Sequence, residues 1–145
     1  MTKLWIVVAD EAKARILSTN NSTDALSELQ TLSTSETSMR EQDLVSDKSG
    51  KSYDSAGKGR HSMGEKSDHK EQYAIRFAKE IGTYLENHRQ SKDYMKLIIV
   101  AAPHFLGLLR KEFSKGVSEL ISLEIDKDLT MVDTQHIREH LPQYL

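Results

Sequence analysis

The first third of the chain carries short hydrophobic runs that are typical of β-strands. Residues 3–9 (KLWIVVA) form a nearly continuous β-branched and aromatic run, as expected for a strand buried on both faces. Residues 12–17 alternate apolar and basic positions, which predicts an amphipathic partner strand after a turn at Asp10. A shorter alternation across residues 26–32 predicts a third strand at the edge of the sheet.

Residues 68–88 have the spacing of apolar side chains that is typical of an α-helix. Asp68, with Glu71 three residues later, predicts a helix N-cap with a capping box. Six large side chains then recur at positions that share one face of a helix of about twenty residues. These are Tyr73, Phe77, Ile81, Tyr84, Leu85 and His88. The periodicity therefore predicts a long helix packed along this stripe.

Two further apolar runs, residues 96–102 and 120–125, alternate with shorter predicted helices. Pro103 suits the first turn of a helix that we expect Gly116 to end, and Asp133 marks the start of a last helix. The predicted order is βββαβαβα, a meander followed by α/β crossovers, which is the order of ribonuclease H-like folds. We therefore predict one α/β domain over residues 1–145, with a mixed β-sheet and helices on its faces.

Composition narrows the class of protein. A chain of 145 residues suits one domain, and its lack of cysteine excludes thiolate catalysis, disulfide scaffolds and cysteine-ligated metals. The 20 Lys and Arg against 22 Asp and Glu give a net charge of −2, so any binding to nucleic acid must be local. No apolar run reaches the ~18 residues of a membrane span or resembles an export signal, so we expect a cytoplasmic protein without membrane insertion.

Residues 46–70 differ from the rest of the chain. They hold four of the seven glycines, six basic and four acidic residues, and almost no apolar side chain. Long structureless loops inside compact domains are uncommon unless they are functional or disordered. We therefore predict a flexible, glycine-rich basic loop at 46–67 that contacts RNA through phosphate charge and base stacking.

Three other chemistries are less well supported. Asp10 ends the first strand as in a ribonuclease H-like nuclease, but residues 100–103 supply no second carboxylate, so a turn role is favoured. Residues 49–52 (SGKS) resemble the end of a phosphate-binding loop without its earlier glycine. His136 and His140 are four apart on the last helix, and two ligands do not make a zinc site. We expect no metal and no cofactor.

Blocks spread over most of the chain resemble the bacterial host attachment family, described as proteins required for attachment to host cells. In the first half of the chain the blocks are WIVVAD (5–10), ARI (14–16), LVSD (44–47), GKSYDSAG (50–57) and GRHSM (59–63). In the second half they are FA (77–78) together with Leu85, LIIVAAP (97–103), FLGLLR (105–110), DKDLT (126–130) and REHL (138–141). That family is in turn similar to the middle domain of eukaryotic and archaeal release factors and of Pelota. The resemblance implies the same fold.

The resemblance also implies a function. Release factors carry a Gly-Gly-Gln tripeptide in the corresponding loop, and this sequence has none. We therefore expect a non-enzymatic, translation-associated protein that contacts the ribosome or tRNA. The expected contact residues are Asp47, Gly50, Lys51, Ser52, Tyr53, Asp54, Gly57, Lys58, Gly59, Arg60 and His61. Two alternatives stay open, an interaction protein that supports attachment through protein contacts and a hydrolase of an RNA-linked ester.

Overall fold

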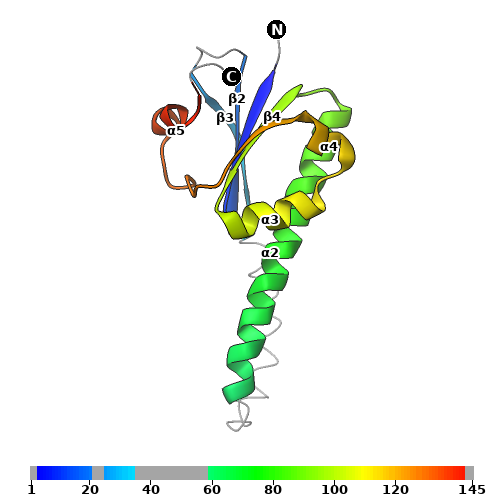
Figure 1. The fold of residues 1–145 in the computed structure, drawn as a ribbon, viewed down its shortest axis with the longest axis vertical. Helices are drawn as coiled ribbons and strands as arrows, with labels where there is room; N and C mark the ends of the chain where they lie inside the picture. The colour runs from blue at the N-terminus through cyan, green and yellow to red at the C-terminus, as the bar shows by residue number, and fades with distance from the viewer. Residues whose placement is uncertain (1–2, 21–24, 35–58, 143–145) are drawn as a thin grey trace.

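The computed structural model describes residues 3–20, 25–34 and 59–142, with the backbone alone between 59 and 68. Five strands form a mixed sheet in the order β3-β2-β1-β4-β5, with helices on both faces (Figure 1). The strands are β1 (Leu4–Ala9), β2 (Lys13–Thr19), β3 (Ser27–Ser33), β4 (Lys96–Ala101) and β5 (Ile121–Ile125). The helices are α2 (Gly59–Gln90), α3 (Pro103–Glu112), α4 (Lys115–Leu120) and α5 (Thr134–His140).

The sheet is built around β1, which is buried along its whole length. It pairs antiparallel with β2 and parallel with β4, so that Val7 lies between Ile16 and Ile99. β3 closes one edge as an antiparallel partner of β2, and β5 closes the other as a parallel partner of β4. The predicted α/β domain with its mixed sheet is confirmed, and the strand order is compatible with a ribonuclease H-like fold.

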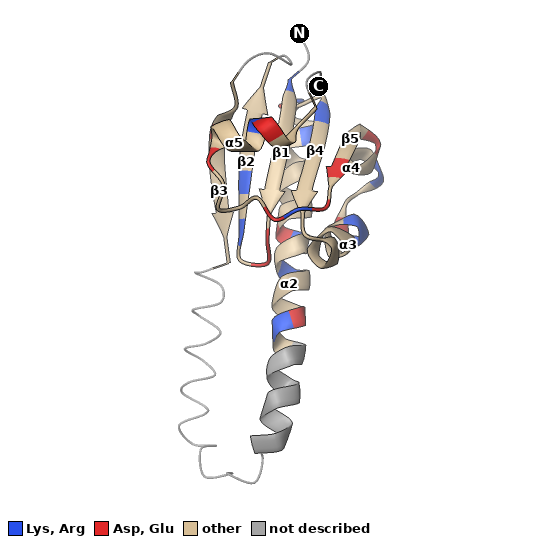
Figure 2. Cartoon of the chain, turned by 60° about the vertical axis from the view of Figure 1, so that its left-hand side comes forward, with Lys and Arg blue, Asp and Glu red and all other residues tan. Residues whose placement is uncertain are grey.

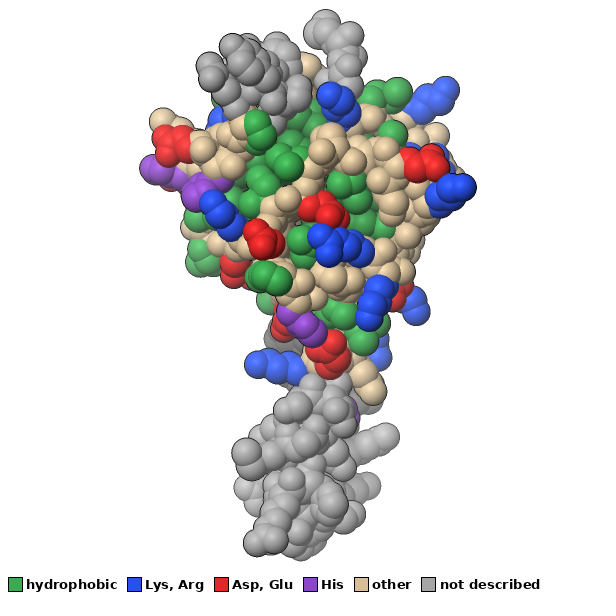
Figure 3. Space-filling view, in the orientation of Figure 1, with side chains coloured by type: hydrophobic (Ala, Val, Ile, Leu, Met, Phe, Trp, Pro, Cys, Tyr) green, Lys and Arg blue, Asp and Glu red, His purple; other side chains and the backbone are tan. Residues whose placement is uncertain are grey.

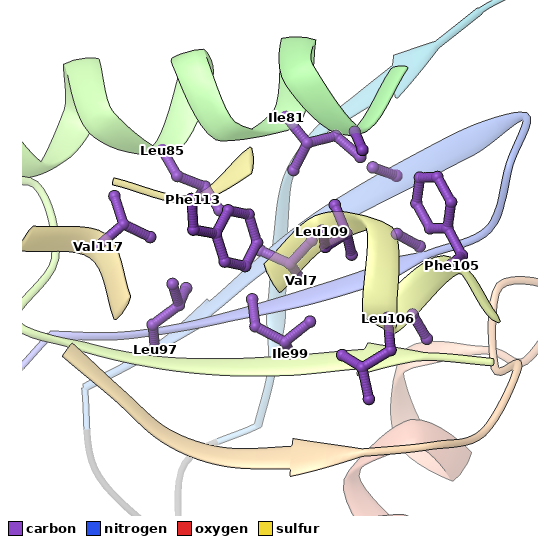
Figure 4. Packing of buried hydrophobic residues seen from close by; sticks show 14 of the residues in the cluster. Val7, Ile81, Leu85, Leu97, Ile99, Phe105, Leu106, Leu109, Phe113 and Val117 are labelled. Carbon is purple, nitrogen blue, oxygen red and sulfur yellow. The ribbon is translucent and has the colours of Figure 1, made fainter. Parts of the chain in front are cut away.

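Each face of the sheet has its own hydrophobic core. On one face, Val7, Leu97 and Ile99 pack against α2, α3 and α4 (Figure 4). On the other face, alternate residues of the same strands pack against Leu129 and against Ile137 of α5. Because both faces of β1 and β4 are covered, these strands need the continuous apolar runs that the sequence shows.

The predicted start of the long helix is wrong, because α2 begins at Gly59 rather than at Asp68. The residues from 59 to 67 of the predicted loop are therefore helical in backbone conformation. Once a packed helix is nucleated, each added residue gains one backbone hydrogen bond, which offsets the cost of about 1 kcal/mol of a glycine such as Gly64. Glu71, the expected capping partner of Asp68, instead contacts His104 Nε2 of α3 through its Oε2, at 2.8 Å.

The predicted end of α3 at Gly116 is also wrong. The helix stops at Glu112, and the short helix α4 follows, with Gly116 inside it. Ser114 causes the new start, because its side chain accepts a hydrogen bond from the Val117 N–H at 3.1 Å. Leu120, predicted to open the last strand, ends α4 instead.

The Ser114 hydroxyl also ties α4 to the carboxyl end of α2. It donates to Glu86 Oε1 at 2.8 Å, while Arg89 and Gln90 donate to the same carboxylate. The hydrogen bonds from Arg89, Gln90 and Ser114 lower the pKa of Glu86 to about 2. The carboxylate therefore stays ionised at neutral pH and joins the carboxyl end of α2 to the start of α4.

A close helix crossing gives a first prediction. A Cβ atom at Gly82 of α2 would lie 2.9 Å from the Glu112 carbonyl oxygen of α3, whereas one at Gly107 would meet nothing within 4 Å. Gly82→Ala should lower the free energy of unfolding by about 1 to 3 kcal/mol, because the two helices must separate. Gly107→Ala should raise it by up to about 1 kcal/mol through helix propensity. Urea unfolding of both variants checks this, and shifts of the same sign would contradict the crossing.

Candidate functional site

The carboxyl ends of the parallel strands meet at one end of the molecule, where open α/β sheets usually bind ligands. Asp10 follows β1, Ala102 and Pro103 follow β4, and Asp126 follows β5. The segment 126–133 then crosses the ends of β4 and β1 on its way to α5 (Figure 2). This end of the sheet therefore brings together sequence blocks that lie more than one hundred residues apart.

Asp10 is the centre of this strand end. Its Oδ1 accepts hydrogen bonds from the N–H groups of Ala12 and Lys13, at 2.8 and 2.7 Å, which confirms its predicted role as a turn residue. Its Oδ2 lies 3.0 Å from the hydroxyl of Thr130. The same hydroxyl lies 2.7 Å from Asp128 Oδ1. Thr130 is only 2 % exposed, so its hydroxyl is shared between two carboxylates inside the protein.

Arg15 of β2 fixes the crossing segment from the sheet side. Its Nη1 atom donates to the carbonyl oxygen of Thr130 at 3.1 Å and also to that of Val132. Its Nε donates to Glu28 Oε1 of β3 at 2.5 Å. Because Arg15 is 9 % exposed, these acceptors replace the water that its guanidinium loses on folding.

Asp10 and Arg15 hold the segment 126–133 against the end of the sheet, and we call these two residues the clamp. Asp10 Oδ1 accepts two backbone hydrogen bonds, and its Oδ2 lies beside the buried Thr130 hydroxyl. A shallow hollow of about 300 Å³ beside Arg15 is lined by charges of both signs, among them Lys13, Glu28 and Asp133. Its mixed lining favours neither an anion nor a cation. The arrangement positions the segment 126–133 and does not resemble the carboxylate set of a metal-dependent nuclease.

Of the two histidines of α5, His136 is engaged by a neighbouring side chain. His136 Nδ1 lies 2.7 Å from Asp133 Oδ1, and Asp133 is the N-cap of the helix, which confirms the predicted helix start near this residue. Hydrogen bonding between the two side chains raises the pKa of His136, and hydrogen bonds from the backbone and the ring of His136 lower that of Asp133. Within residues 3–20, 25–34 and 59–142, no three His, Asp or Glu side chains gather closely enough to hold a metal ion.

Most of the predicted RNA-binding residues lie outside the described part of the chain. This applies to Asp47, Gly50, Lys51, Ser52, Tyr53, Asp54, Gly57 and Lys58, and to the phosphate-loop-like residues 49–52. The backbone of Gly59, Arg60 and His61 forms the first turn of α2. The predicted contact segment thus leads directly into the long helix.

The amino-terminal part of α2 projects from the domain. A helix of 32 residues is roughly 48 Å long, whereas a strand of six residues spans about 20 Å. In the described part, the first buried residue of α2 is Ala74. α2 therefore continues beyond the carboxyl ends of the strands, past the clamp described above (Figure 1).

Three side chains contact one another in series along the described base of this projection. His69 and Tyr73 contact each other edge to face, with ring centroids 6.3 Å apart. The guanidinium of Arg76 lies over the Tyr73 ring, 5.9 Å from its centroid. The spacing i, i+4, i+7 places all three on one side of the helix. We call this set the α2 stack; His69 and Arg76 are exposed and Tyr73 is half-buried.

Charge is unevenly divided between this region and the rest of the chain. Residues 47–79 contain eight Lys and Arg against five Asp and Glu, a net charge of +3. Because the whole chain has a net charge of −2, the remainder carries −5. On the described face shown in Figure 3, basic and acidic side chains are mixed. A local excess of positive charge thus coincides with the segment that leads into α2 and with its projecting part.

Sequence reasoning missed two parts of this end of the molecule. Tyr73 was assigned to the buried stripe, although the sheet ends before it and leaves the ring half-exposed. The spacing of His69, Tyr73 and Arg76 was the signal that could have revealed the stack. The contact between Asp10 and Thr130 joins residues 120 positions apart, which no local pattern contains. The resemblance of the DKDLT block to the family was the signal that pointed to residues 126–130.

The family model described as "Protein required for attachment to host cells" matches residues 5–141. No characterised protein matches the sequence significantly. Among the helices of the described residues, none combines the length and the apolar composition of a membrane span.

Proposed function

The chain belongs to the family of proteins required for attachment to host cells, and from that premise we propose that it is a non-enzymatic RNA-contacting protein whose partner is the ribosome or tRNA. The family description names a cellular outcome and no molecular activity. RNA contact is the molecular activity that the net positive charge of residues 47–79 favours. The residues that we assign to it are the segment 47–61 and the projecting part of α2.

The charge asymmetry is the observation that carries the proposal. Phosphate neutralisation dominates nucleic-acid affinity, and it needs local positive charge rather than a basic protein. The net charge of +3 over residues 47–79 belongs to the sequence that leads into α2 and forms its amino-terminal half. A projecting helix can reach into a grooved RNA surface that the body of the domain cannot enter.

The resemblance to the middle domain of release factors and Pelota is a second support. The observed strand order is compatible with the ribonuclease H-like order of that domain. The absence of a Gly-Gly-Gln tripeptide argues for contact without ester hydrolysis. We therefore prefer RNA contact without catalysis to hydrolase activity as the proposed function.

Salt dependence tests the proposal. Lys70 and Lys79 are exposed on α2, and changing both to Ala should remove about two phosphate contacts. The slope of log affinity against log salt should then flatten by about 1.4, at roughly 0.7 per contact for single strands. The triple change of Lys51, Lys58 and Arg60 to Ala should flatten it by about 2. Fluorescence anisotropy with labelled single-stranded RNA and with tRNA measures both.

Lys3 and Lys96 provide the matched control. Both are exposed, and they lie at the opposite end of the sheet, at the starts of β1 and β4. The double change of these lysines to Ala should leave the slope unchanged. Wild-type protein without measurable affinity for either RNA at low salt would overturn the proposal and favour the alternative, an interaction protein that acts through protein contacts.

A further inference from the structure

We propose that the α2 stack of His69, Tyr73 and Arg76 is a platform for unpaired RNA bases, so that the protein selects single-stranded over double-stranded RNA. This inference rests on the proposed function and adds the chemical class of RNA that the surface takes. It concerns base stacking, whereas the salt experiment above concerns phosphate contacts.

The geometry of the stack favours this ligand. The ring of Tyr73 is half-buried at the base of the projection, where the first buried turn of α2 begins beside it. It holds the edge-to-face contact with His69 and the contact with the Arg76 guanidinium. Both ends of the stack are exposed side chains with flat π surfaces. In the proposed platform, a base stacks on the exposed His69 ring or on the exposed Arg76 guanidinium.

The chemistry of these groups matches unpaired nucleotides. Bases that are not already stacked in a duplex stack on aromatic rings and on guanidinium planes, largely without sequence preference. Arginine adds a positive charge to the stacking surface, which suits the neighbouring phosphates. Arg76 also borders an open hollow of about 330 Å³, lined in addition by Lys79, Glu80 and Thr83, which offers room beside the stack.

Neighbouring charge favours RNA over an apolar partner. The stack lies within the segment of net charge +3, beside the exposed Lys70. Two acidic side chains lie near the stack: Glu71, which is engaged by His104 of α3 at 2.8 Å, and Glu80, which lines the same hollow as Arg76. Ile75 is the large apolar side chain exposed on the same turn, and one exposed apolar residue does not make an apolar docking patch.

Two substitutions separate stacking from charge. Arg76→Lys keeps the positive charge and removes the planar group, and His69→Ala removes an exposed ring. Each should weaken binding of a labelled short oligouridylate by about 5- to 100-fold, the range that corresponds to the loss of one stacked base. The salt slope should stay that of the wild type. Binding of an RNA duplex of the same length should be weaker in the wild type and unchanged in both variants.

Matched controls exclude general effects. Arg110→Lys makes the same chemical change on α3, where Arg110 pairs with Glu124, and Ile75→Ala changes an exposed side chain beside the stack. Both should bind oligouridylate like the wild type. If the wild type binds RNA but Arg76→Lys and His69→Ala bind it equally well, the inference is overturned and the proposed function stands. If the wild type binds neither RNA, both fail.

Discussion

Phe77→Ala is expected to lower the free energy of unfolding by about 3 to 5 kcal/mol. Phe77 is 1 % exposed in the middle of α2, and its ring stacks on Phe105 of α3, with centroids 6.1 Å apart. Truncation removes the contacts by which the long helix holds α3, and the surrounding strands are too rigid to fill the cavity. Urea unfolding followed by circular dichroism measures the loss.

Lys79→Ala is the control on the same helix. Lys79 is exposed two residues after Phe77, so its removal should change the free energy of unfolding by no more than about half a kcal/mol. Similar losses for the two variants would mean that α2 does not pack on the sheet with the assigned face.

Arg15→Ala is expected to cost about 2 to 4 kcal/mol, because it leaves two carbonyl oxygens of the segment 126–133 without their buried donor. These are the carbonyl groups of Thr130 and Val132. Glu28→Gln should cost no more than about 1 kcal/mol, since the Glu28 side chain is 40 % exposed and water can replace its partner. If urea unfolding gave the same loss of unfolding free energy for Arg15→Ala and Glu28→Gln, the clamp would depend on the ion pair rather than on the backbone contacts.

The central strands could be predicted from sequence because their environment leaves a local signature. β1 and β4 are buried on both faces, and only continuous apolar runs fit such positions. The edge position of β3 was likewise predicted from its weak alternation, and its side chains are almost all exposed. The N-cap of α5 at Asp133 was visible because capping is decided within four residues.

The start of α2 could not be predicted in the same way. Asp68 and Glu71 satisfy the local rule for a helix start, but helix propagation from the packed part of α2 outweighs it. Glu71 finds its partner in His104, 33 residues away, and no local pattern contains that contact. The extra helix α4 arises from Ser114, whose capping role was hidden behind the stronger signal of Gly116.

In the candidate site too, features set by local sequence could be predicted and features set by long-range contacts could not. Asp10 was recognised as a turn residue because its turn is local, whereas its contact with Thr130 depends on the path of residues 126–133 across the sheet. The exposure of Tyr73 depends on where the strands end, which a periodic pattern along α2 does not contain. The assignment of residues 47–58 to RNA contact stays a prediction.

Co-sedimentation with ribosomes from the native host tests the central claim most directly. Wild-type protein is mixed with purified ribosomes and centrifuged at low and at high salt, beside the Lys70 and Lys79 double variant and the Lys3 and Lys96 control. RNA contact through α2 predicts that wild type and control sediment with ribosomes at low salt and are released at high salt, while the Lys70 and Lys79 variant stays largely in the supernatant. Wild-type protein that remains in the supernatant at low salt, or two double variants that sediment alike, would contradict it.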